Sequence, residues 1–202
     1  MDMKSATPSG LTADQINELP PMDFEGEIIL VTTKTQARKA IEFLKDEPIL
    51  GFDTETRPSF KKGEFHHVAL LQLATKNKAY LFHLCKAPML PEVVELLASP
   101  DILKVGVATR DDVKALQKLL DFTPEGFIDI AKRLAAKTKN PGKTPGLRSL
   151  VAEYLGYRLS KGAKITNWEA DKLSKAQIKY AAKDAVAGIL IYQKLIELGQ
   201  LK

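Results

Sequence analysis

The sequence predicts a single domain of the α/β or α+β class, in which helices pack on a sheet. Short apolar segments typical of strands mix along the chain with longer segments whose apolar residues repeat at helical spacing, and several strand-like segments come early. The chain has 202 residues, of which 45% are hydrophobic and 27% are charged. This length suits one domain with a substantial core, and the composition is that of an ordinary globular protein.

The first half of the chain is predicted to hold a tail, one helix and four strands. Residues 1–22 are rich in Pro, Ser, Thr and Asp, and we expect them to form a flexible tail in front of a domain at residues 23–202. Residues 33–46 predict a helix, because alanine, isoleucine and leucine recur there at helical spacing. Short apolar stretches bounded by polar residues or proline predict strands at residues 27–32, 48–55, 67–75 and 79–84. The polar turn between the last two predicts a hairpin.

The second half is predicted to be mostly helical. One more buried strand is expected at residues 101–108, and the Pro- and Gly-rich residues 140–146 predict a loop. The longest helix is predicted at residues 174–198, where Ser174 and Gln177 have the spacing of a capping box. Apolar residues at helical spacing predict further helices at residues 91–99, 110–121, 128–138 and 147–156.

Positive charge is concentrated in one segment of the chain. The formal net charge is +5, and residues 132–164 contain nine basic residues but a single acidic one. The rest of the chain is therefore net negative. Such a segment is either a solvated lysine-rich face or a surface that follows a phosphate backbone, and composition alone leaves both interpretations open.

Composition also argues against several classes of protein. No apolar run approaches the roughly 20 residues that span a bilayer, so we expect no membrane association. The N-terminus lacks the apolar segment of a secretory signal. Cys85 is the only cysteine in the sequence and cannot form an internal disulfide. These features predict an intracellular protein, cytoplasmic in a bacterium or nuclear in a eukaryote, and no obligate protein partner is indicated.

Asp53 and Glu55 lie where an apolar strand is predicted to end. Because side chains alternate along a strand, both carboxylates point from the same face, where two like charges repel unless something positive lies between them. Two solvated acids at a surface strand end are the simpler interpretation of this pair alone. Strand ends in α/β sheets are also where binding sites gather, so the pair becomes a candidate site if other acids join it.

A second acidic pair, Asp111 and Asp112, opens the helix predicted at residues 110–121. Acids in a first turn interact favourably with the helix dipole, and this explains at least one of them. Asp112 shares a helical face with Leu116 and Leu120, so it points toward the core side, where an unpaired carboxylate is costly. Asp111 lies on a wetter face and is better explained as a cap or surface residue.

The long C-terminal helix carries the third candidate. Tyr180 and Asp184 are four residues apart and therefore adjacent on one face of that helix. Alanines and a glycine surround them, and such small residues allow a helix to approach another backbone closely. The pair is interpreted either as a hydrogen bond within the core or as part of a site.

Acids from three separate segments can therefore face a common pocket: Asp53, Glu55, Asp112 and Asp184. Oxygen ligands suit hard cations such as Mg²⁺ or Mn²⁺, and two divalent ions would balance four negative charges. Two such ions can activate water and stabilise the leaving oxygen in phosphodiester hydrolysis.

These segments resemble the three motifs of the DEDD superfamily of 3′→5′ exonucleases. The matching stretches are Phe-Asp-Thr-Glu at residues 52–55, Gly-Val-Ala-Thr-Arg-Asp-Asp at residues 106–112 and Tyr-Ala-Ala-Lys-Asp at residues 180–184. Lys179, rather than a histidine, stands five residues before Asp184, which is similar to the tyrosine branch of the superfamily, called DEDDy. The resemblance is greatest to exonuclease domains of the Werner type and extends over about residues 26–198. The chain departs from the pattern at Ala108, where the family often has glycine.

The resemblance implies a ribonuclease-H-like fold, which is a mixed sheet flanked by helices. It also implies a 3′→5′ exonuclease that releases nucleoside 5′-monophosphates, with Tyr180 orienting the attacking water. The implied cofactors are two divalent ions, Mg²⁺ or Mn²⁺, held by Asp53, Glu55, Asp112 and Asp184. Contacts with the substrate are expected from Thr54, Lys143 and Arg148.

DNA is the expected substrate, and RNA is the alternative. The Werner-type resemblance favours DNA. Ribonuclease D shares all three motifs, but it usually adds helical domains for which this chain leaves no room after its last helix, so we expect DNA. Two further alternatives are weaker. A phosphatase of the haloacid dehalogenase type would have aspartate at position 55 and give Tyr180 and Asp184 no role. A nucleic-acid-binding module with a decayed site is disfavoured because every motif residue is present.

Overall fold

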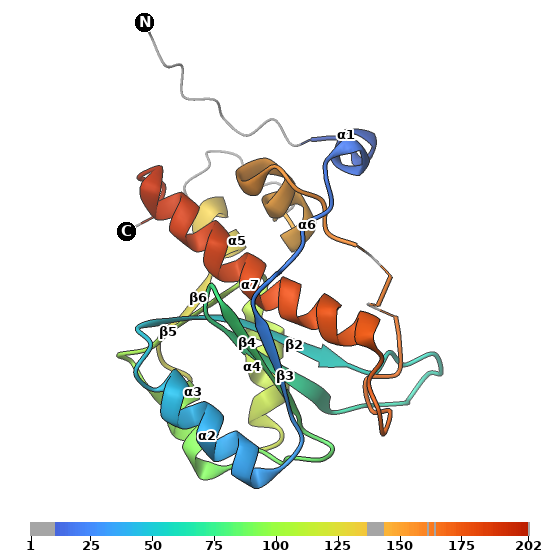
Figure 1. Ribbon diagram of the computed structural model, residues 1–202, viewed down its shortest axis with the longest axis vertical. Coiled ribbons are helices and arrows are strands. Elements are labelled where there is room, and N and C mark those ends of the chain that lie inside the picture. The colour runs from blue at the N-terminus through green and yellow to red at the C-terminus, as the bar shows by residue number, and fades with distance from the viewer. Residues whose placement is uncertain (1–10, 137–143, 161, 164, 202) are drawn as a thin grey trace, which may run out of the picture.

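A mixed six-stranded sheet lies at the centre of the computed structural model, which describes residues 11–136, 144–160, 162–163 and 165–201 (Figure 1). The strands are β1 (Glu27–Val31), β2 (Ile49–Thr56), β3 (Val68–Ala74), β4 (Lys78–His83), β5 (Leu103–Gly106) and β6 (Phe127–Asp129). Their order in the sheet is β1-β4-β3-β2-β5-β6. The strand β3 runs antiparallel to both of its neighbours, and the other neighbouring pairs are parallel. The predicted mixed sheet is therefore confirmed.

Helices cover both faces of this sheet (Figure 1). One face packs against α2 (Lys34–Leu44), α3 (Pro91–Ala98) and α4 (Thr109–Gln117). The other face packs against the long helix α7 (Lys175–Glu197), α5 (Ile130–Ala135), α6 (Leu147–Leu150) and the π-helical turn η1 (Val151–Leu155). Each face buries its own apolar cluster, which is the expected arrangement for a sheet between two layers of helices. Within the described part of the chain, we find no helix with the length and apolar character needed to cross a membrane.

From β1 onward, the predicted elements agree with the structure except in two places. The predicted hairpin is formed by β3 and β4, and α7 begins with the predicted capping box at Ser174. The prediction of a helix at residues 128–138 is wrong at its start, because Phe127–Asp129 form β6 and pair in parallel with β5. Three residues are too few for strand alternation to be recognised, and the pairing partner is distant in sequence. The predicted helix at residues 147–156 is divided into α6 and η1.

Residues 11–22 pack on the domain, which differs from the flexible tail predicted for residues 1–22, and residues 1–10 of that predicted tail lie outside the described residues. Within this segment, helix α1 (Ala13–Glu18) begins with a capping box at Thr12. The Arg158 guanidinium donates a hydrogen bond to the Leu19 carbonyl at 2.9 Å, and Met22 is buried in the cluster around α7. The packing of this segment was not predicted because its composition is mostly polar and only a few residues anchor it.

The long helix α7 lies very close to the strands beneath it. A Cβ atom at Gly51 of β2 would lie 2.0 Å from the carbonyl oxygen of Ala185, and one at Gly188 would lie 2.9 Å from the carbonyl oxygen of Val105. Only glycine permits backbones to approach so closely. The small residues that suggested close packing in the sequence thus bring α7 against the middle of the sheet.

Candidate active site

The candidate site lies at the end of β2, where this strand extends beyond its neighbour. Pairing between β2 and β5 covers only residues 49–51, whereas pairing with β3 continues to Thr56. Residues 53–55 therefore have one strand neighbour and face the space between α4 and α7. Asp53 and Glu55 point from the face that α7 covers, and Thr54 points from the opposite face.

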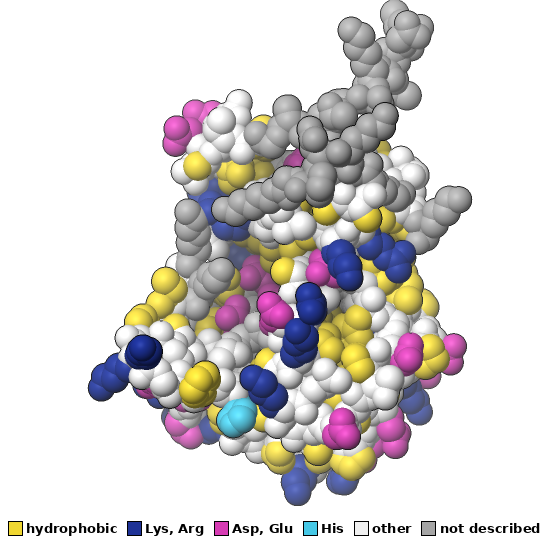
Figure 2. Space-filling model, turned by 180° about the vertical axis from the view of Figure 1, so that it is seen from behind, with side chains coloured by type: hydrophobic (Ala, Val, Ile, Leu, Met, Phe, Trp, Pro, Cys, Tyr) yellow, Lys and Arg dark blue, Asp and Glu magenta, His cyan; other side chains and the backbone are white. Residues whose placement is uncertain are grey.

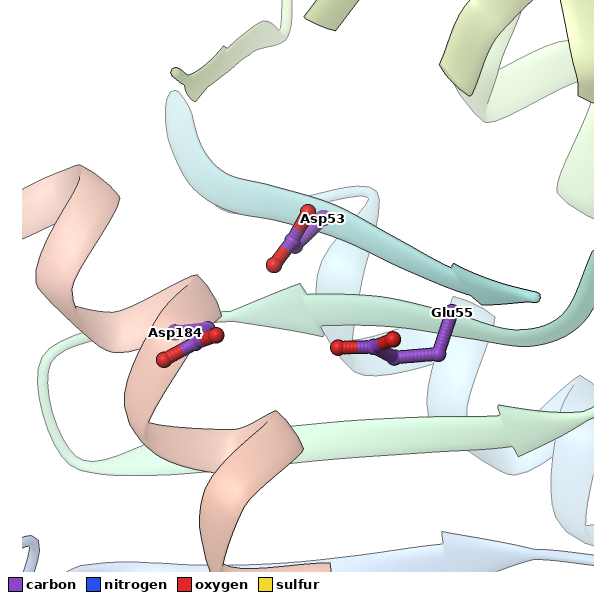
Figure 3. A group of neighbouring side chains, drawn as sticks. All are labelled: Asp53, Glu55 and Asp184. Carbon is purple, nitrogen blue, oxygen red and sulfur yellow. The ribbon is translucent and has the colours of Figure 1, made fainter. Parts of the chain in front are cut away.

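Three carboxylates meet in this space (Figure 3). One oxygen each from Asp53, Glu55 and Asp184 lie within 4.8 Å of one another. Asp53 and Glu55 come from β2 and Asp184 from α7, so two elements separated by more than a hundred residues build the cluster. Because Asp184 is buried, the repulsion between these groups is only weakly screened by water.

Asp112 lies beside these three carboxylates, lines the same cleft from the first turn of α4 and is held by Thr54. The Thr54 hydroxyl donates a short hydrogen bond to the Asp112 carboxylate. Asp112 is partly buried and lines the cleft, whereas Asp111 is exposed and does not. The helical-face argument therefore chose the acid that reaches the site.

The turn into α4 contains the one described non-glycine residue with a left-handed backbone. Ala108 has φ of 60°, and its N–H donates to the Asp129 carboxylate at 3.1 Å. An alanine in this region costs about 1 kcal/mol or more relative to its ordinary conformation. This strained residue stands at the position where the DEDD exonucleases often have glycine. The turn that contains it leads into the helix that places Asp112 in the cleft.

Burial and neighbouring acids raise the pKa of two carboxylates in the cleft. Burial raises the pKa of Asp53 well above its ordinary value, and the charges of Asp184, Asp112 and Glu55 raise it further. Burial also raises the pKa of Asp112, although the hydrogen bond from Thr54 opposes this effect. The Asp53 shift is the one expected of a carboxylate buried among other acids, whereas the charges that raise the pKa of Asp112 are those of Asp111 and Asp129.

Tyr180 borders the cluster on the α7 side. Its hydroxyl hydrogen-bonds the Asp184 side chain, and its ring lies against the fully buried Trp168 with 6.2 Å between ring centres. Burial, followed by the charges of Asp184 and Glu55, raises the pKa of Tyr180 above its ordinary value. Tyr180 is therefore a protonated hydrogen-bond donor at neutral pH.

All five predicted catalytic residues line one cleft with a volume of about 460 Å³. Two predicted substrate contacts, Thr54 and Arg148, line it as well. Arg148 supplies the one basic side chain among the described residues of this lining, and its Nε donates to the Leu159 carbonyl at 3.1 Å. The third predicted contact, Lys143, lies outside the described residues. The structure brings these side chains together, while their roles in binding and catalysis stay predictions.

Reasoning from sequence missed one group of polar contacts, which involves the loop after β2. His66, which shows no ligand spacing in the sequence, lies between Glu64 and Glu169 at 3.3 and 3.0 Å. Arg57 contacts Glu169 at 3.2 Å. These contacts join the loop after β2 to the segment before α7. No local pattern in the sequence predicts a contact between His66 and Glu169, which are 103 residues apart.

Comparison with protein families gives one description for almost the whole chain. A family model described as "3'-5' exonuclease" matches residues 28–200. The chain is 34% identical over 191 residues to the mouse protein named bifunctional 3'-5' exonuclease/ATP-dependent helicase WRN, covering 91% of this chain and 14% of that protein. It is 30% identical over 170 residues to ribonuclease D of Gluconacetobacter diazotrophicus, covering 84% of this chain and 42% of that protein. The chain thus spans less than half the length of these curated relatives.

Solved structures share the architecture at lower sequence identity. The EXO domain of Aedes aegypti Nibbler superposes with a TM-score of 0.76 at 23% identity, covering 88% of this chain and 94% of that one. Escherichia coli RNase D superposes with a TM-score of 0.74 at 24% identity, covering 87% of this chain and 45% of that one. At such identities the likeness concerns the fold alone, and it confirms the predicted ribonuclease-H-like fold.

Proposed function

Because this chain belongs to the family of 3′-5′ exonucleases, we propose that it hydrolyses phosphodiester bonds from the 3′ end of a nucleic acid and releases nucleoside 5′-monophosphates. The observation that carries this proposal is the convergence of four carboxylates and Tyr180, from three separate segments, in one cleft. An arrangement of this kind fits metal-assisted hydrolysis better than nucleophilic attack by a side chain. No single carboxylate stands apart from the others as a nucleophile.

The acidic cluster fits divalent cations by its donor set and by its charge. Exonucleases of this family use divalent metal ions, and Asp53, Glu55, Asp112 and Asp184 would hold them here. Carboxylate oxygens are the ligands that Mg²⁺ and Mn²⁺ prefer, and we propose two ions of either kind. When bound, such ions supply an activated water and stabilise charge on the leaving oxygen.

The other side chains of the cleft orient the reactants in this proposal. The Tyr180 hydroxyl, a donor beside Asp184, positions the attacking water. The Arg148 guanidinium pairs with a phosphate of the substrate strand, for which its charge and planar donors are suited. Thr54 holds Asp112 in place through its hydroxyl, and as a residue of the cleft lining it is proposed to contact the terminal nucleotide.

The substrate is proposed to be DNA, with RNA as the second candidate. The motif resemblance to Werner-type domains favours DNA, whereas the relatives named ribonuclease D favour RNA about equally. One solved structure with this fold is a ribonuclease D in complex with RNA, and this supports RNA as the second candidate substrate. The basic residues between the second and third motifs suit either phosphate backbone.

A degradation assay on a denaturing gel tests both parts of the proposal. Single-stranded DNA, duplex DNA with a recessed 3′ end and RNA, each labelled at the 5′ end, are incubated with Mg²⁺, Mn²⁺ or EDTA. We expect stepwise shortening from the 3′ end with metal and none with EDTA, and the fastest substrate decides between DNA and RNA. Asp53→Ala should abolish shortening, and Asp111→Ala is the matched control because Asp111 is exposed outside the cleft. Internal cleavage, or shortening that survives Asp53→Ala, would contradict the proposal.

A further inference from the structure

Two phenylalanine rings stand in solvent on the loop between β2 and β3. Phe60 is 79% exposed and Phe65 is 90% exposed, the largest fractions among the large hydrophobic side chains of the described residues. A single exposed ring is ordinary, but two on one short loop expose an unusual amount of apolar area to water. Such a surface is typical of a contact with a partner or a ligand.

The loop that carries the rings is held in a defined shape. The Phe60 N–H donates to the Glu64 carboxylate at 3.3 Å, which closes the loop on itself. Glu64 contacts His66 at 3.3 Å, and His66 contacts Glu169 on the far side at 3.0 Å. Arg57 contacts the same Glu169 at 3.2 Å. The rings are therefore presented by a braced loop, and little ordering is left for binding to require.

The charge of the loop indicates the chemistry of what it meets. Lys61 and Lys62 are both exposed and lie between the two rings in the sequence. Figure 2 shows Lys or Arg and hydrophobic side chains together on the projecting edge at the left of that view. Apolar rings interleaved with lysines match a polyanion that also offers flat apolar faces. Single-stranded nucleic acid has both properties, because its bases are unpaired and its backbone is charged.

The loop is also close enough to the cleft for one nucleic-acid strand to contact both. It begins at Arg57, two residues after Glu55, and ends just before Val68 of β3. Five extended residues from Glu55 to Phe60 reach about 17 Å at most. That reach equals about five base steps of 3.4 Å, within the site sizes of single-strand binding proteins.

We propose that residues 57–67 form a stacking platform on which unpaired bases near the 3′ end of the substrate rest, with Phe60 and Phe65 against the bases and Lys61 and Lys62 against the phosphates. The inference rests on the proposed function, which places the 3′ end of the nucleic acid in the cleft. It adds that the enzyme holds its substrate as a single strand before the cleft. Every base has an aromatic face, so the platform accepts DNA and RNA alike.

Binding in EDTA separates the platform from catalysis. The probe is a fluorescein-labelled single-stranded DNA of about 12 nucleotides, measured by anisotropy, with a blunt duplex of the same length as comparison. The double variant Phe60→Ala/Phe65→Ala should weaken single-strand binding about 10-fold to 100-fold and change duplex binding little. The double change to Trp should retain the affinity, whereas the double change to Leu should not, because leucine is apolar but cannot stack. Leu198→Ala, which removes an exposed apolar side chain elsewhere, is the matched control.

A second measurement reports contact directly. Trp168 is the one tryptophan of the chain and is fully buried, so Phe65→Trp adds an exposed indole with distinct emission. Single strands should quench that emission, and duplex should not. Unchanged binding in the alanine variant, or equal losses for single strand and duplex, would overturn the platform and leave a protein partner as the use of this surface. Loss of binding with no degradation of any strand would instead overturn the proposed function and leave the platform standing.

Discussion

Residues on both faces of β2 contribute to the same cleft, as Thr54 shows. Asp53 and Glu55 point toward α7, and Thr54 points the other way and donates its hydroxyl to Asp112 of α4. A carboxylate that accepts such a bond keeps its orientation, and the partners of metal ligands influence metal affinity through this orientation.

Replacing Thr54 by valine should weaken the site without changing its volume. Thr54→Val removes the donor to Asp112, and we expect metal affinity or turnover to fall about 10-fold to 100-fold. Metal titration and turnover at saturating substrate measure the effect. Thr54→Ser keeps the hydroxyl and should stay close to the parent protein. A valine variant that is indistinguishable from the serine variant would show that the hydrogen bond is dispensable.

Tyr180 allows a prediction that separates orientation from metal binding. Tyr180→Phe removes the hydroxyl beside Asp184 but leaves the ring against Trp168. We expect turnover to fall about 10²-fold, since misplacing a reactant has effects of this size, while metal affinity is retained. Rates under single-turnover conditions and metal titration of the same sample are the measurements. Unchanged turnover would remove Tyr180 from the mechanism.

At the scale of elements, the contact between α7 and β2 determines where Asp184 lies. Gly51 and Ala185 meet backbone to backbone, and Gly188 meets β5 in the same way. The strand that carries Asp53 and Glu55 is thus held against the helix that carries Asp184, a few residues from the cluster. The geometry of the site is a consequence of this packing.

Adding one methyl group at Gly51 should disturb both stability and activity. In Gly51→Ala the new Cβ would lie 2.0 Å from the Ala185 carbonyl oxygen, so the helix must move. We expect the free energy of unfolding to fall by about 3 kcal/mol, the upper part of the range for overpacking. Denaturant unfolding measures this loss, and turnover per folded molecule should fall as well. Gly162→Ala is the control, because its nearest neighbour, the Ser160 hydroxyl, lies at 3.5 Å. Equal stability of both variants would refute the close contact.

A buried lysine joins α3 to β5 on the opposite side of the sheet. The Lys104 ammonium group donates to the carbonyl oxygens of Leu96, Ser99 and Ile102 at 3.2, 2.7 and 2.8 Å. It also lies 5.1 Å from the centre of the Phe127 ring. Burial lowers the pKa of Lys104 to about 8, even though these contacts favour the charged form.

This lowered pKa predicts how stability changes in alkaline solution. Between about pH 8 and pH 10.5 the folded protein loses the Lys104 proton while the unfolded chain keeps it. The unfolded state then binds more protons, so the contribution of Lys104 to the free energy of unfolding rises with pH over this range. Lys104→Met lacks the effect, and the difference in unfolding free energy between parent and variant should shift in favour of the parent as pH rises. Urea unfolding at several pH values measures it, and a constant difference would show that the carbonyl contacts hold the proton throughout.

For the whole molecule, metal binding and folding should be coupled. The acids come from β2, α4 and α7, so the site exists only in the folded chain. A ligand that binds only the folded state at about 100 times its Kd adds roughly 2.7 kcal/mol to the free energy of unfolding. We expect Mg²⁺ or Mn²⁺ to raise the melting temperature relative to EDTA. Asp184→Asn should lose this rise and Asp111→Asn should keep it. A melting temperature indifferent to both metals in the parent protein would contradict the site.

The parts of the fold that the sequence predicted are those governed by local pattern. Strand alternation, helical spacing and the capping box at Ser174 placed most elements correctly, and the helical face of α4 distinguished Asp112 from Asp111. β6 was missed because three residues carry no period, and α1 was missed because a few anchoring residues lie in a polar segment. Such elements form because of contacts with residues that are distant in the sequence, and a local pattern cannot reveal those contacts.

Residue identity and spacing indicate which side chains can form the site. The sequence contains carboxylates at the ends of apolar strands, a tyrosine one turn from an aspartate, and three motifs in the order of a known family. That these side chains meet in one cleft depends on how the chain packs. The close approach of α7 to β2 sets the separation of the acids, and the length of β2 beyond β5 opens the cleft. The brace through His66 and Glu169 also belongs to the tertiary structure alone. Distances and burial depend on backbones that pack across the whole chain, whereas residue identity and spacing are local properties.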